Sequence, residues 1–250
     1  MTSWSTNQPS DYTFPILERV FKHYSTFSYK VSDQILVCCQ HLLEPQLKMF
    51  EKLIEFGFRP ENIYVIGKVY STNKTISEEL QNKGVHVLQT NFSGEAFDVE
   101  HLKNCEELIS KLPNSAECVV LDDGAQLIKV FIKHQKKVRF AVEQTSSGFR
   151  KLENLNIPFP VINVARSETK LVQESYFIAN DCYERIQDYF NSNIDTSILI
   201  VGLGPIGKAI LNVFTENGIK AEGCDVRLGH TDLVRIIEER AWNHYWRYRF

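Results

Sequence analysis

Short apolar runs alternate with amphipathic stretches along most of this chain of 250 residues, and this alternation restricts the fold more than any other feature. The apolar runs have the length of β-strands, whereas the amphipathic stretches repeat their apolar residues every three or four positions, as one face of a helix does. Strands that alternate with helices build a parallel sheet with helices on both faces. The sequence therefore predicts an α/β fold with a doubly wound, mostly parallel sheet.

Turn residues separate the apolar runs, so the order of the elements can be predicted. The expected strands are QILVCC, NIYVIG, VHVLQ, CVVLDD, VRFAVEQ, FPVINV, SILIVG and IKAEGCD. The expected helices begin at Pro45 and lie near residues 74–83, 99–111, 124–135, 168–191 and 231–240. Each strand is thus followed by a helix or a loop that returns the chain to the same edge of a sheet.

The stretch LIVGLGPIGKAI, residues 199–210, is a strand that runs into a glycine-spaced loop and then a helix. Gly202, Gly204 and Gly207 have the spacing that lets a pyrophosphate approach a helix N-terminus, where N–H groups favour anions. Asp225 ends the next apolar run, where a carboxylate accepts hydrogen bonds from ribose hydroxyls and disfavours a 2′-phosphate. The pattern predicts a Rossmann-type unit for NAD rather than NADP, unless the glycines serve packing alone.

The chain ends at Phe250, before the second half of a dinucleotide-binding domain. We therefore expect an incomplete Rossmann βαβ unit with two strands at residues 191–250, and poor affinity for NAD. Two strands leave apolar sheet edges that something must cover. The expected cover is another copy of the chain, most simply in a dimer, or the aromatic tail from Trp242 to Phe250.

Charge and composition exclude several classes of partner and site. A net charge of −3 gives no basis for binding nucleic acid or an anionic membrane surface, and no apolar run is long enough to span a bilayer. The seven histidines show neither HxH nor HExxH spacing, so no metal site is expected. The six cysteines show no CxxC spacing, and Cys38, Cys39, Cys118 and Cys224 lie inside apolar runs as core residues do. Because the N-terminus also lacks a signal-peptide pattern, we expect a cytoplasmic, reduced protein.

Four further motifs occur in a defined order before the glycine loop. They are CQHLLEP, LDDGAQLI, VEQTSSGFRKL and FPVINVARSETK. In this order, followed by a long helix and the glycine loop, they resemble S-adenosylhomocysteine hydrolase over about residues 34–240. The resemblance implies an N-terminal segment at 1–33, a substrate domain at 34–190 and the beginning of an NAD-binding domain at 191–250. It also implies hydrolysis of S-adenosylhomocysteine to adenosine and homocysteine with bound NAD.

Where residues match, the resemblance implies roles for individual side chains. His41 matches a general acid or base beside the scissile ribose carbon, Asp123 matches a carboxylate of the same site, and Lys170 matches a lysine near the ribose 3′-hydroxyl. The residues that would contact the cofactor are Thr145, Ser146, Ser147, Gly202, Gly204, Gly207 and Asp225.

Several positions of that site depart from the family. Gln144 stands where the family has a glutamate that grips the ribose hydroxyls, and an amide cannot draw a proton away. Glu174 and Ser175 replace an aspartate–asparagine pair, and Leu43 and Pro45 replace the threonine and glutamate that read adenine. We therefore expect hydrolysis to be weak or absent.

Alternatives from other classes remain open. A non-catalytic protein could keep a nucleoside or NAD pocket, or lend its fold to a partner. A truncated product could have little function of its own. A D-2-hydroxyacid dehydrogenase shares the architecture, but the LDDG and EQTSSG motifs count against it.

Overall fold

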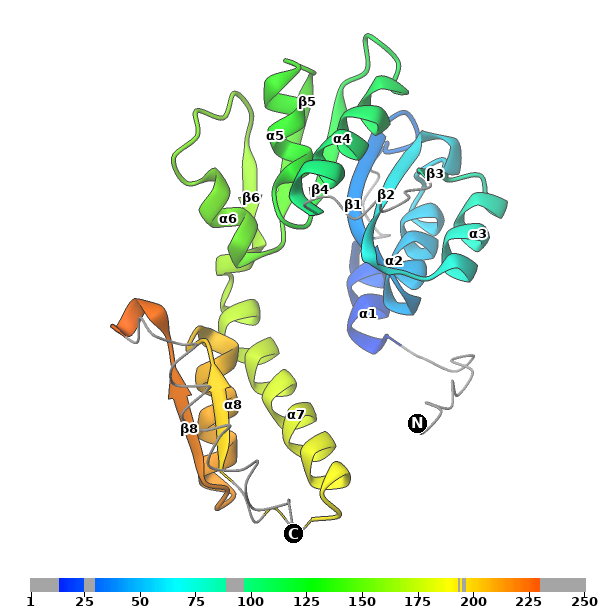
Figure 1. Cartoon of the computed structure of the whole chain (residues 1–250). Helices are drawn as coiled ribbons and strands as arrows, with labels where there is room; N and C mark the ends of the chain where they lie inside the picture. Colours follow the sequence, from blue (N-terminus) through cyan, green and yellow to red (C-terminus); the bar gives the residue numbers. More distant parts are fainter. Residues whose placement is uncertain (1–13, 25–29, 89–96, 193, 195–196, 230–250) are drawn as a thin grey trace. The chain divides into compact units, whose positions relative to one another are not determined.

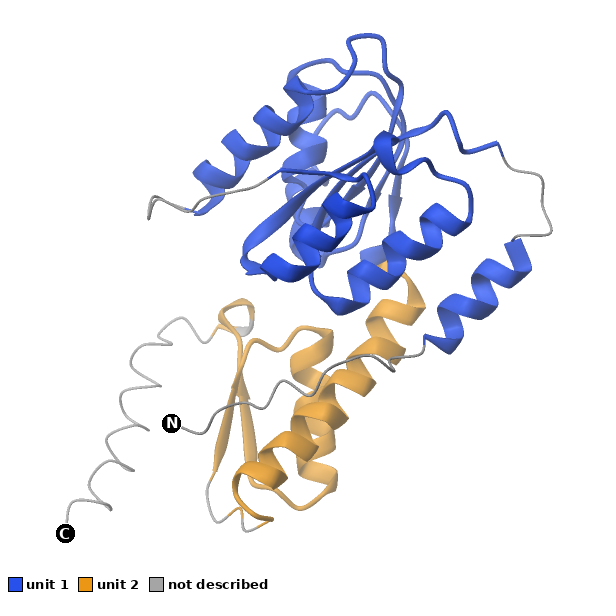
Figure 2. Cartoon of the chain, turned by 90° about the vertical axis from the view of Figure 1, so that its right-hand side faces the viewer, with its two compact units in different colours: residues 1–165 blue, residues 166–250 orange. Residues whose placement is uncertain are grey.

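The structure, a computed structural model, divides the chain into two compact units, Met1–Ala165 and Arg166–Phe250 (Figure 2). The residues that it describes are 14–24, 30–88, 97–192, 194 and 197–229 (Figure 1). The first unit holds a six-stranded sheet, and the second holds a two-stranded sheet.

All neighbouring strands of the six-stranded sheet are parallel, which confirms the predicted fold class. The strands are β1 (Ile35–Leu42), β2 (Ile63–Thr72), β3 (His86–Leu88), β4 (Cys118–Asp122), β5 (Val138–Glu143) and β6 (Val161–Asn163). They lie in the order β3-β2-β1-β4-β5-β6 (Figure 1). The order reverses between β1 and β4, and in such sheets ligands bind beyond the carboxyl ends of the strands at this reversal.

Helices cover both faces of this sheet. The helices that pack on its faces are α2 (Glu44–Glu55), α3 (Lys74–Asn82), α4 (Phe97–Ser110), α5 (Gln126–Lys133) and α6 (Ser146–Leu152). The chain also forms α1 (Pro15–Tyr24), which buries no residue, and the short helices η1 (Pro60–Asn62) and η2 (Val164–Arg166). Successive residues of a strand point to opposite faces, so Cys39 packs with Leu108 and Phe131 of α4 and α5. Cys38 packs with Phe50 of α2 on the other face. The two apolar cores explain why β1 is apolar at every position from Leu36 to Cys39.

Local sequence signals set the beginnings of two of these helices. Pro45 occupies the first turn of α2, where its missing N–H costs nothing. The side chain of Asn73 accepts hydrogen bonds from the backbone N–H groups of Thr75 and Ile76 and so caps α3. These two starts follow from residues that are adjacent in the sequence.

β1 and β2 are longer than the sequence indicates. His41 lies inside β1 rather than after it, because β1 continues to Leu42, which pairs with Thr72 across a shift in register. Correspondingly, β2 passes the expected end at Gly67 and places Lys68 within the strand. Strand pairing therefore places two polar residues, His41 and Lys68, within strands, although the apolar pattern assigns them to loops.

The second unit consists of two helices packed against each other and a parallel strand pair. Its elements are η3 (Thr169–Glu174, a π-helix), α7 (Ser175–Tyr189), β7 (Ile198–Val201), α8 (Pro205–Glu216), β8 (Ala221–Cys224) and η4 (Val226–Leu228). Ala179 of α7 packs with Val213 and Phe214 of α8. Because of this contact, the structure divides the chain between Ala165 and Arg166, whereas the sequence predicts a division at residue 190.

The two-stranded β7–β8 pair agrees with the expected start of a Rossmann unit. Cys38, Cys39, Cys118 and Cys224 are buried free thiols, which confirms them as core residues. In the part of the chain that the structure describes, no helix has the length and apolar character needed to cross a bilayer. The expected helix near 231–240 and the tail from Trp242 lie outside the described residues, and the expected dimer and cytoplasmic location stay predictions.

Candidate functional site

Polar side chains gather at the carboxyl ends of β1, β2 and β4, where the strand order reverses. His41 Nε2 lies 3.6 Å from Asp123 Oδ2. The other carboxylate oxygen of Asp123 lies 3.9 Å from Nζ of Lys68, which also donates to the Asp123 backbone carbonyl. The Lys68 side chain is only 3% exposed. Tyr70, in contrast, is exposed, and the centroid of its ring lies 5.8 Å from that of His41. The structure thus brings His41 and Asp123 together, as predicted.

Two buried carboxyl groups fix the loop that carries Asp123. Glu143 accepts hydrogen bonds from the backbone N–H groups of Gly124 at 3.1 Å and Ala125 at 2.9 Å. Asp122 accepts one from the N–H of Ile128 at 2.8 Å, and its second oxygen has no partner among the described residues. Burial, and then the nearby charge of Glu143, raises the pKa of Asp122 to about 7. The loop between β4 and α5 is therefore held by the side chains of two buried residues, Glu143 and Asp122.

Of the three residues Thr145, Ser146 and Ser147, which are predicted to contact the cofactor, the first has a structural role and the other two are accessible. Thr145 caps α6, because its hydroxyl oxygen accepts a hydrogen bond from the N–H of Gly148 at 3.0 Å. The same hydroxyl donates to Glu143 at 2.7 Å and lies 3.3 Å from the hydroxyl of Ser147. Ser146 is half-buried and Ser147 is exposed. Of the three hydroxyls, those of Ser146 and Ser147 are the better placed to meet a ligand.

The amide of Gln144 is joined to the neighbouring strand. Gln40 of β1 donates to Gln144 Oε1 at 2.7 Å, and Gln40 is buried. The backbone N–H of Gln144 donates to the carbonyl of Asp122 at 3.1 Å. Since its oxygen already accepts from Gln40, the Gln144 side chain has mainly N–H groups to offer a ligand. This arrangement cannot replace the carboxylate that the resemblance implies at this position.

A second cluster, of aromatic and polar side chains, adjoins the ring of Tyr70. The ring of Phe97 lies 5.2 Å from that of Tyr70 and stacks at 5.2 Å on His101. His101 Nε2 is 3.2 Å from Cys39 Sγ. Burial, reinforced by the charge of Lys68, lowers the pKa of His101 to about 4, so this imidazole is neutral at physiological pH. An aromatic row therefore leads from the exposed site into the core.

Lys170 and Glu174, predicted to be catalytic, lie in η3 of the second unit and pair with each other. Nζ of Lys170 lies 2.7 Å from each carboxylate oxygen of Glu174. The hydroxyl of Ser175 donates to the Lys170 carbonyl at 3.3 Å. The ammonium group of Lys170, which the resemblance implies near a ribose hydroxyl, is thus paired with Glu174, the residue that replaces the family's aspartate.

The glycine loop between β7 and α8 has the conformation its spacing predicts. Gly202 has a φ of +95°, which favours glycine. A Cβ on Gly207 would overlap the carbonyl oxygen of Gly202, so the helix packs on the loop only without a side chain there. Gly204 is the N-terminal cap of α8. The three glycines form a loop whose N–H groups stand at a helix N-terminus.

The carboxylate of Asp225, predicted to accept hydrogen bonds from ribose hydroxyls, is bound by groups of the chain itself. It accepts hydrogen bonds from the loop N–H of Leu203 at 2.8 Å and from the backbone N–H of Arg227 at 2.9 Å. Nε and Nη2 of Arg227 donate to it at 3.1 and 2.9 Å, and these bonds hold the pKa of Asp225 well below its usual range. The Asp225 side chain is 5% exposed and that of Arg227 60% exposed. The group that faces solvent here is the guanidinium and not the carboxylate.

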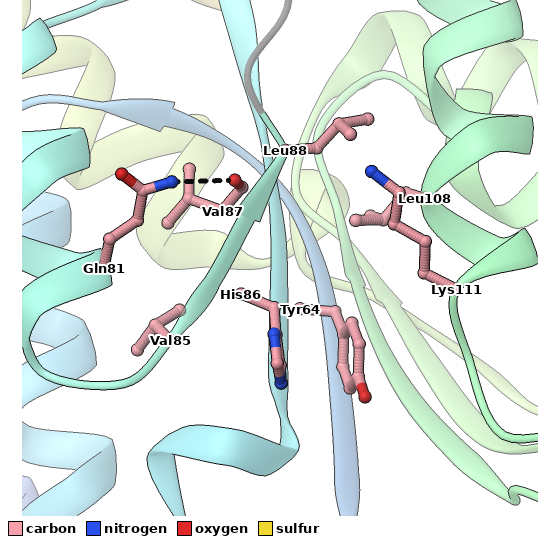
Figure 3. Close-up of a pocket in the computed structure, with 8 residues that line it drawn as sticks. All are labelled: Tyr64, Gln81, Val85, His86, Val87, Leu88, Leu108 and Lys111. Carbon is pink, nitrogen blue, oxygen red and sulfur yellow. Dashed lines mark hydrogen bonds between the residues drawn. The ribbon is translucent and has the colours of Figure 1, made fainter.

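No predicted site residue lines the cavity beside the edge strand β3. This cavity measures about 390 Å³ and is bordered by the stacked rings of Tyr64 and His86, with Leu108 of α4 and Lys111 directly after that helix (Figure 3). Gln81 donates to the Val87 carbonyl across one side. Among the described residues, no group of three or more histidine, cysteine or acidic side chains is placed to hold a metal ion.

Three residues of these sites, Gln40, Lys68 and Arg227, were not predicted from the sequence. A glutamine and a lysine that directly follow apolar strand runs could have been noticed, because buried polar groups at strand ends are rarely without a partner. The signal for Arg227 is weaker, since an exposed arginine two residues after Asp225 looks like any surface cation.

The fold and the sites define an α/β protein with a cluster of polar side chains at the carboxyl edge of a parallel sheet and a second unit that carries a glycine loop. No protein-family profile matches the chain. Two curated relatives are the uncharacterized proteins MT0113 and Rv0104 of Mycobacterium tuberculosis (strains CDC 1551 / Oshkosh and ATCC 25618 / H37Rv), each 31% identical over 235 residues. The match takes in 87% of this chain but 45% of each relative, so the chain spans about half the length of the curated relatives it matches.

Proposed function

We propose that this chain is an adenosylhomocysteinase-like protein that binds an adenosine-type nucleoside at the carboxyl edge of the six-stranded sheet and hydrolyses S-adenosylhomocysteine weakly or not at all. The observation that carries the proposal is the His41–Asp123 pair, 3.6 Å apart at the reversal of the strand order. Nucleosides present hydroxyl groups and ring nitrogens, which imidazole, carboxylate and amide groups recognise by hydrogen bonds. The exposed ring of Tyr70 beside His41 offers a face for the base.

The chemistry of the resemblance would use the residues of this chain in defined roles. His41, oriented by Asp123, would move a proton beside the ribose of a nucleoside bound to the first unit. A nicotinamide dinucleotide, when bound at the glycine loop, would supply hydride removal and return. The fit of that cofactor is incomplete, because the Asp225 carboxylate accepts four hydrogen bonds from Leu203 and Arg227.

Three features support weak hydrolysis. Gln144 cannot take up a proton, and its oxygen already accepts from Gln40. Lys170 is paired with Glu174 at 2.7 Å, so its ammonium group must leave a carboxylate before it can serve a substrate hydroxyl. Leu43, half exposed at the same edge, has no polar group with which to read adenine. Each lost or diverted partner costs on the order of a hundredfold in rate.

Calorimetric titration of the full chain with adenosine and S-adenosylhomocysteine tests the proposal. We expect adenosine to bind with a Kd in the micromolar range, and His41→Ala or Asp123→Asn to weaken it about tenfold through the loss of one charge-assisted hydrogen bond. Lys129→Ala, on the exposed side of α5, is the matched control and should leave the Kd unchanged. The absence of heat with both compounds would refute the nucleoside site, and homocysteine release at the rate of an efficient enzyme would refute the loss of activity.

A non-catalytic dinucleotide-binding role is the second candidate. It is favoured by the glycine loop, whose φ at Gly202 and close helix packing at Gly207 are what a pyrophosphate site requires. The same titration with NAD separates the two candidates, because the glycine loop and the His41–Asp123 pair belong to different compact units. Binding of a dinucleotide without adenosine would favour the second candidate.

A further inference from the structure

Arg227 changes what the glycine loop presents to a ligand. Its guanidinium forms two hydrogen bonds to the Asp225 carboxylate, through Nε at 3.1 Å and Nη2 at 2.9 Å. The N–H groups of Leu203 and Arg227 supply two more, so all of the roughly four acceptor positions of a carboxylate are used. The carboxylate is 5% exposed beneath an arginine that is 60% exposed.

We propose that the glycine-loop site selects a dinucleotide with a phosphate on the 2′-oxygen of its adenosine ribose, the NADP class, and that Arg227 is the residue that determines this specificity. The inference rests on the dinucleotide site of the proposed function. It reverses the preference for NAD that Asp225 alone indicates.

The hydrogen-bond geometry disfavours an unphosphorylated ribose. Ribose hydroxyls donate to a carboxylate with unused lone pairs, and Asp225 holds four donors within 3.1 Å. A ribose hydroxyl would therefore have to displace Arg227, breaking two charge-assisted bonds to form one or two weaker ones. The unphosphorylated cofactor therefore lacks the hydrogen bonds that its ribose hydroxyls usually donate to the carboxylate at this position.

The charge at the same place favours a phosphate. A carboxylate at the end of the second strand normally repels a 2′-phosphate, but here the bidentate guanidinium neutralises it. The remaining N–H groups of a guanidinium fork suit phosphate oxygens, and an arginine near this position is the general means by which such folds accept the 2′-phosphate. Nη2 lies 4.0 Å from where a Cβ on Gly204 would stand, so the cation is beside the loop at the positive end of α8.

The experiment measures the Kd of three small probes with the full chain by calorimetry. The probes are 2′,5′-ADP, its isomer 3′,5′-ADP, and 5′-AMP, which share the adenosine and differ in the second phosphate. We expect 2′,5′-ADP to bind at least about tenfold more tightly than either of the others, because one charge-assisted phosphate contact is worth about that factor. Equal affinity for the two isomers would overturn the proposal, since it would mean attraction by net charge alone.

Variants test whether Arg227 is responsible. Arg227→Ala should abolish the advantage of 2′,5′-ADP and strengthen binding of 5′-AMP and NAD a few fold, because Asp225 then has lone pairs for the ribose hydroxyls. The matched control is Lys220→Ala, which removes the same charge at the opposite end of β8 and should change none of the affinities. An unchanged preference in Arg227→Ala would overturn the role of Arg227.

The probes also separate this inference from the proposed function. Tight binding of NAD and 5′-AMP without preference for 2′,5′-ADP would overturn the inference and leave a dinucleotide site in place. If no probe binds, both the inference and the dinucleotide part of the proposal fail. The nucleoside site is tested separately, by the adenosine titration of the His41 and Asp123 variants.

Discussion

Asp122→Asn is expected to change how the stability of the first unit depends on pH. Asp122 is fully buried, accepts one hydrogen bond from Ile128, and has a second oxygen without a partner among the described residues. Burial comes first and the charge of Glu143 second in raising its pKa from 3.8 to about 7, with Asp123 acting in the same direction and Lys68 against it. The variant keeps an acceptor for Ile128 and has no proton to lose.

The magnitude follows from the difference between the two pKa values. One unit corresponds to about 1.36 kcal/mol, so a pKa raised from 3.8 to about 7 corresponds to roughly 4 kcal/mol. The folded protein keeps this proton over a pH range in which the unfolded chain has released it. The contribution of Asp122 to the free energy of unfolding is therefore lost as the pH rises from about 4 to about 7.

His101 acts in the opposite direction. Burial, followed by the charge of Lys68, lowers its pKa from 6.5 to about 4, so below pH 6.5 the unfolded chain takes up a proton that the folded protein refuses. Its contribution is present above pH 6.5 and is lost as the pH falls towards about 4, by roughly 3 kcal/mol. In the wild-type chain, the stability that Asp122 loses as the pH rises is largely offset by the stability that His101 gains. In Asp122→Asn only the His101 contribution remains, so the variant should become more stable as the pH rises to about 6.5.

Urea unfolding from about pH 4.5 to about pH 7.5 provides the measurement, with hydrogen exchange of β1 and β4 amides reporting the first unit by itself. The new amide nitrogen lacks a partner and costs about 1–3 kcal/mol at every pH, so the pH-dependent part of the difference between variant and wild type is diagnostic. That difference should move in favour of the variant by up to about 4 kcal/mol. A difference that is the same at both ends of the range would refute the reasoning.

Three further substitutions test individual features. Ala125→Gly should stabilise the chain by up to about 1 kcal/mol in thermal unfolding, because Ala125 has a φ of +65° that costs a residue with a Cβ about that much; a lower Tm would contradict this. Asn73→Ala should cost about 1 kcal/mol through loss of the α3 cap, with Asn73→Ser as a control that restores most of it. Gln144→Glu should raise homocysteine release if the proposed reaction is correct, and Gln144→Ala should not; equal rates in the two variants would argue against a catalytic role at this position.

The sequence by itself determined the order of the strands and of most helices, because helix and strand periodicity and helix capping depend on residues that are close together in the chain. It did not predict α1 or α6, which are only ten and seven residues long. It also predicted the glycine loop, whose spacing reflects local backbone needs at Gly202 and Gly207. The pairing of His41 with Asp123 followed from the rule that parallel strands bring their carboxyl ends to one edge.

The tertiary structure alone decided which polar groups are engaged and which face a ligand. Gln40 meets Gln144 and Lys68 meets Asp123 across strands that are far apart in the sequence, and the pattern of single strands carries no information on such pairs. The same holds for α7, whose amphipathic sequence is compatible with either unit until Ala179 packs against Phe214. Even Asp225 and Arg227, two residues apart, required side-chain geometry, because only the positions of their atoms show that the arginine covers the carboxylate.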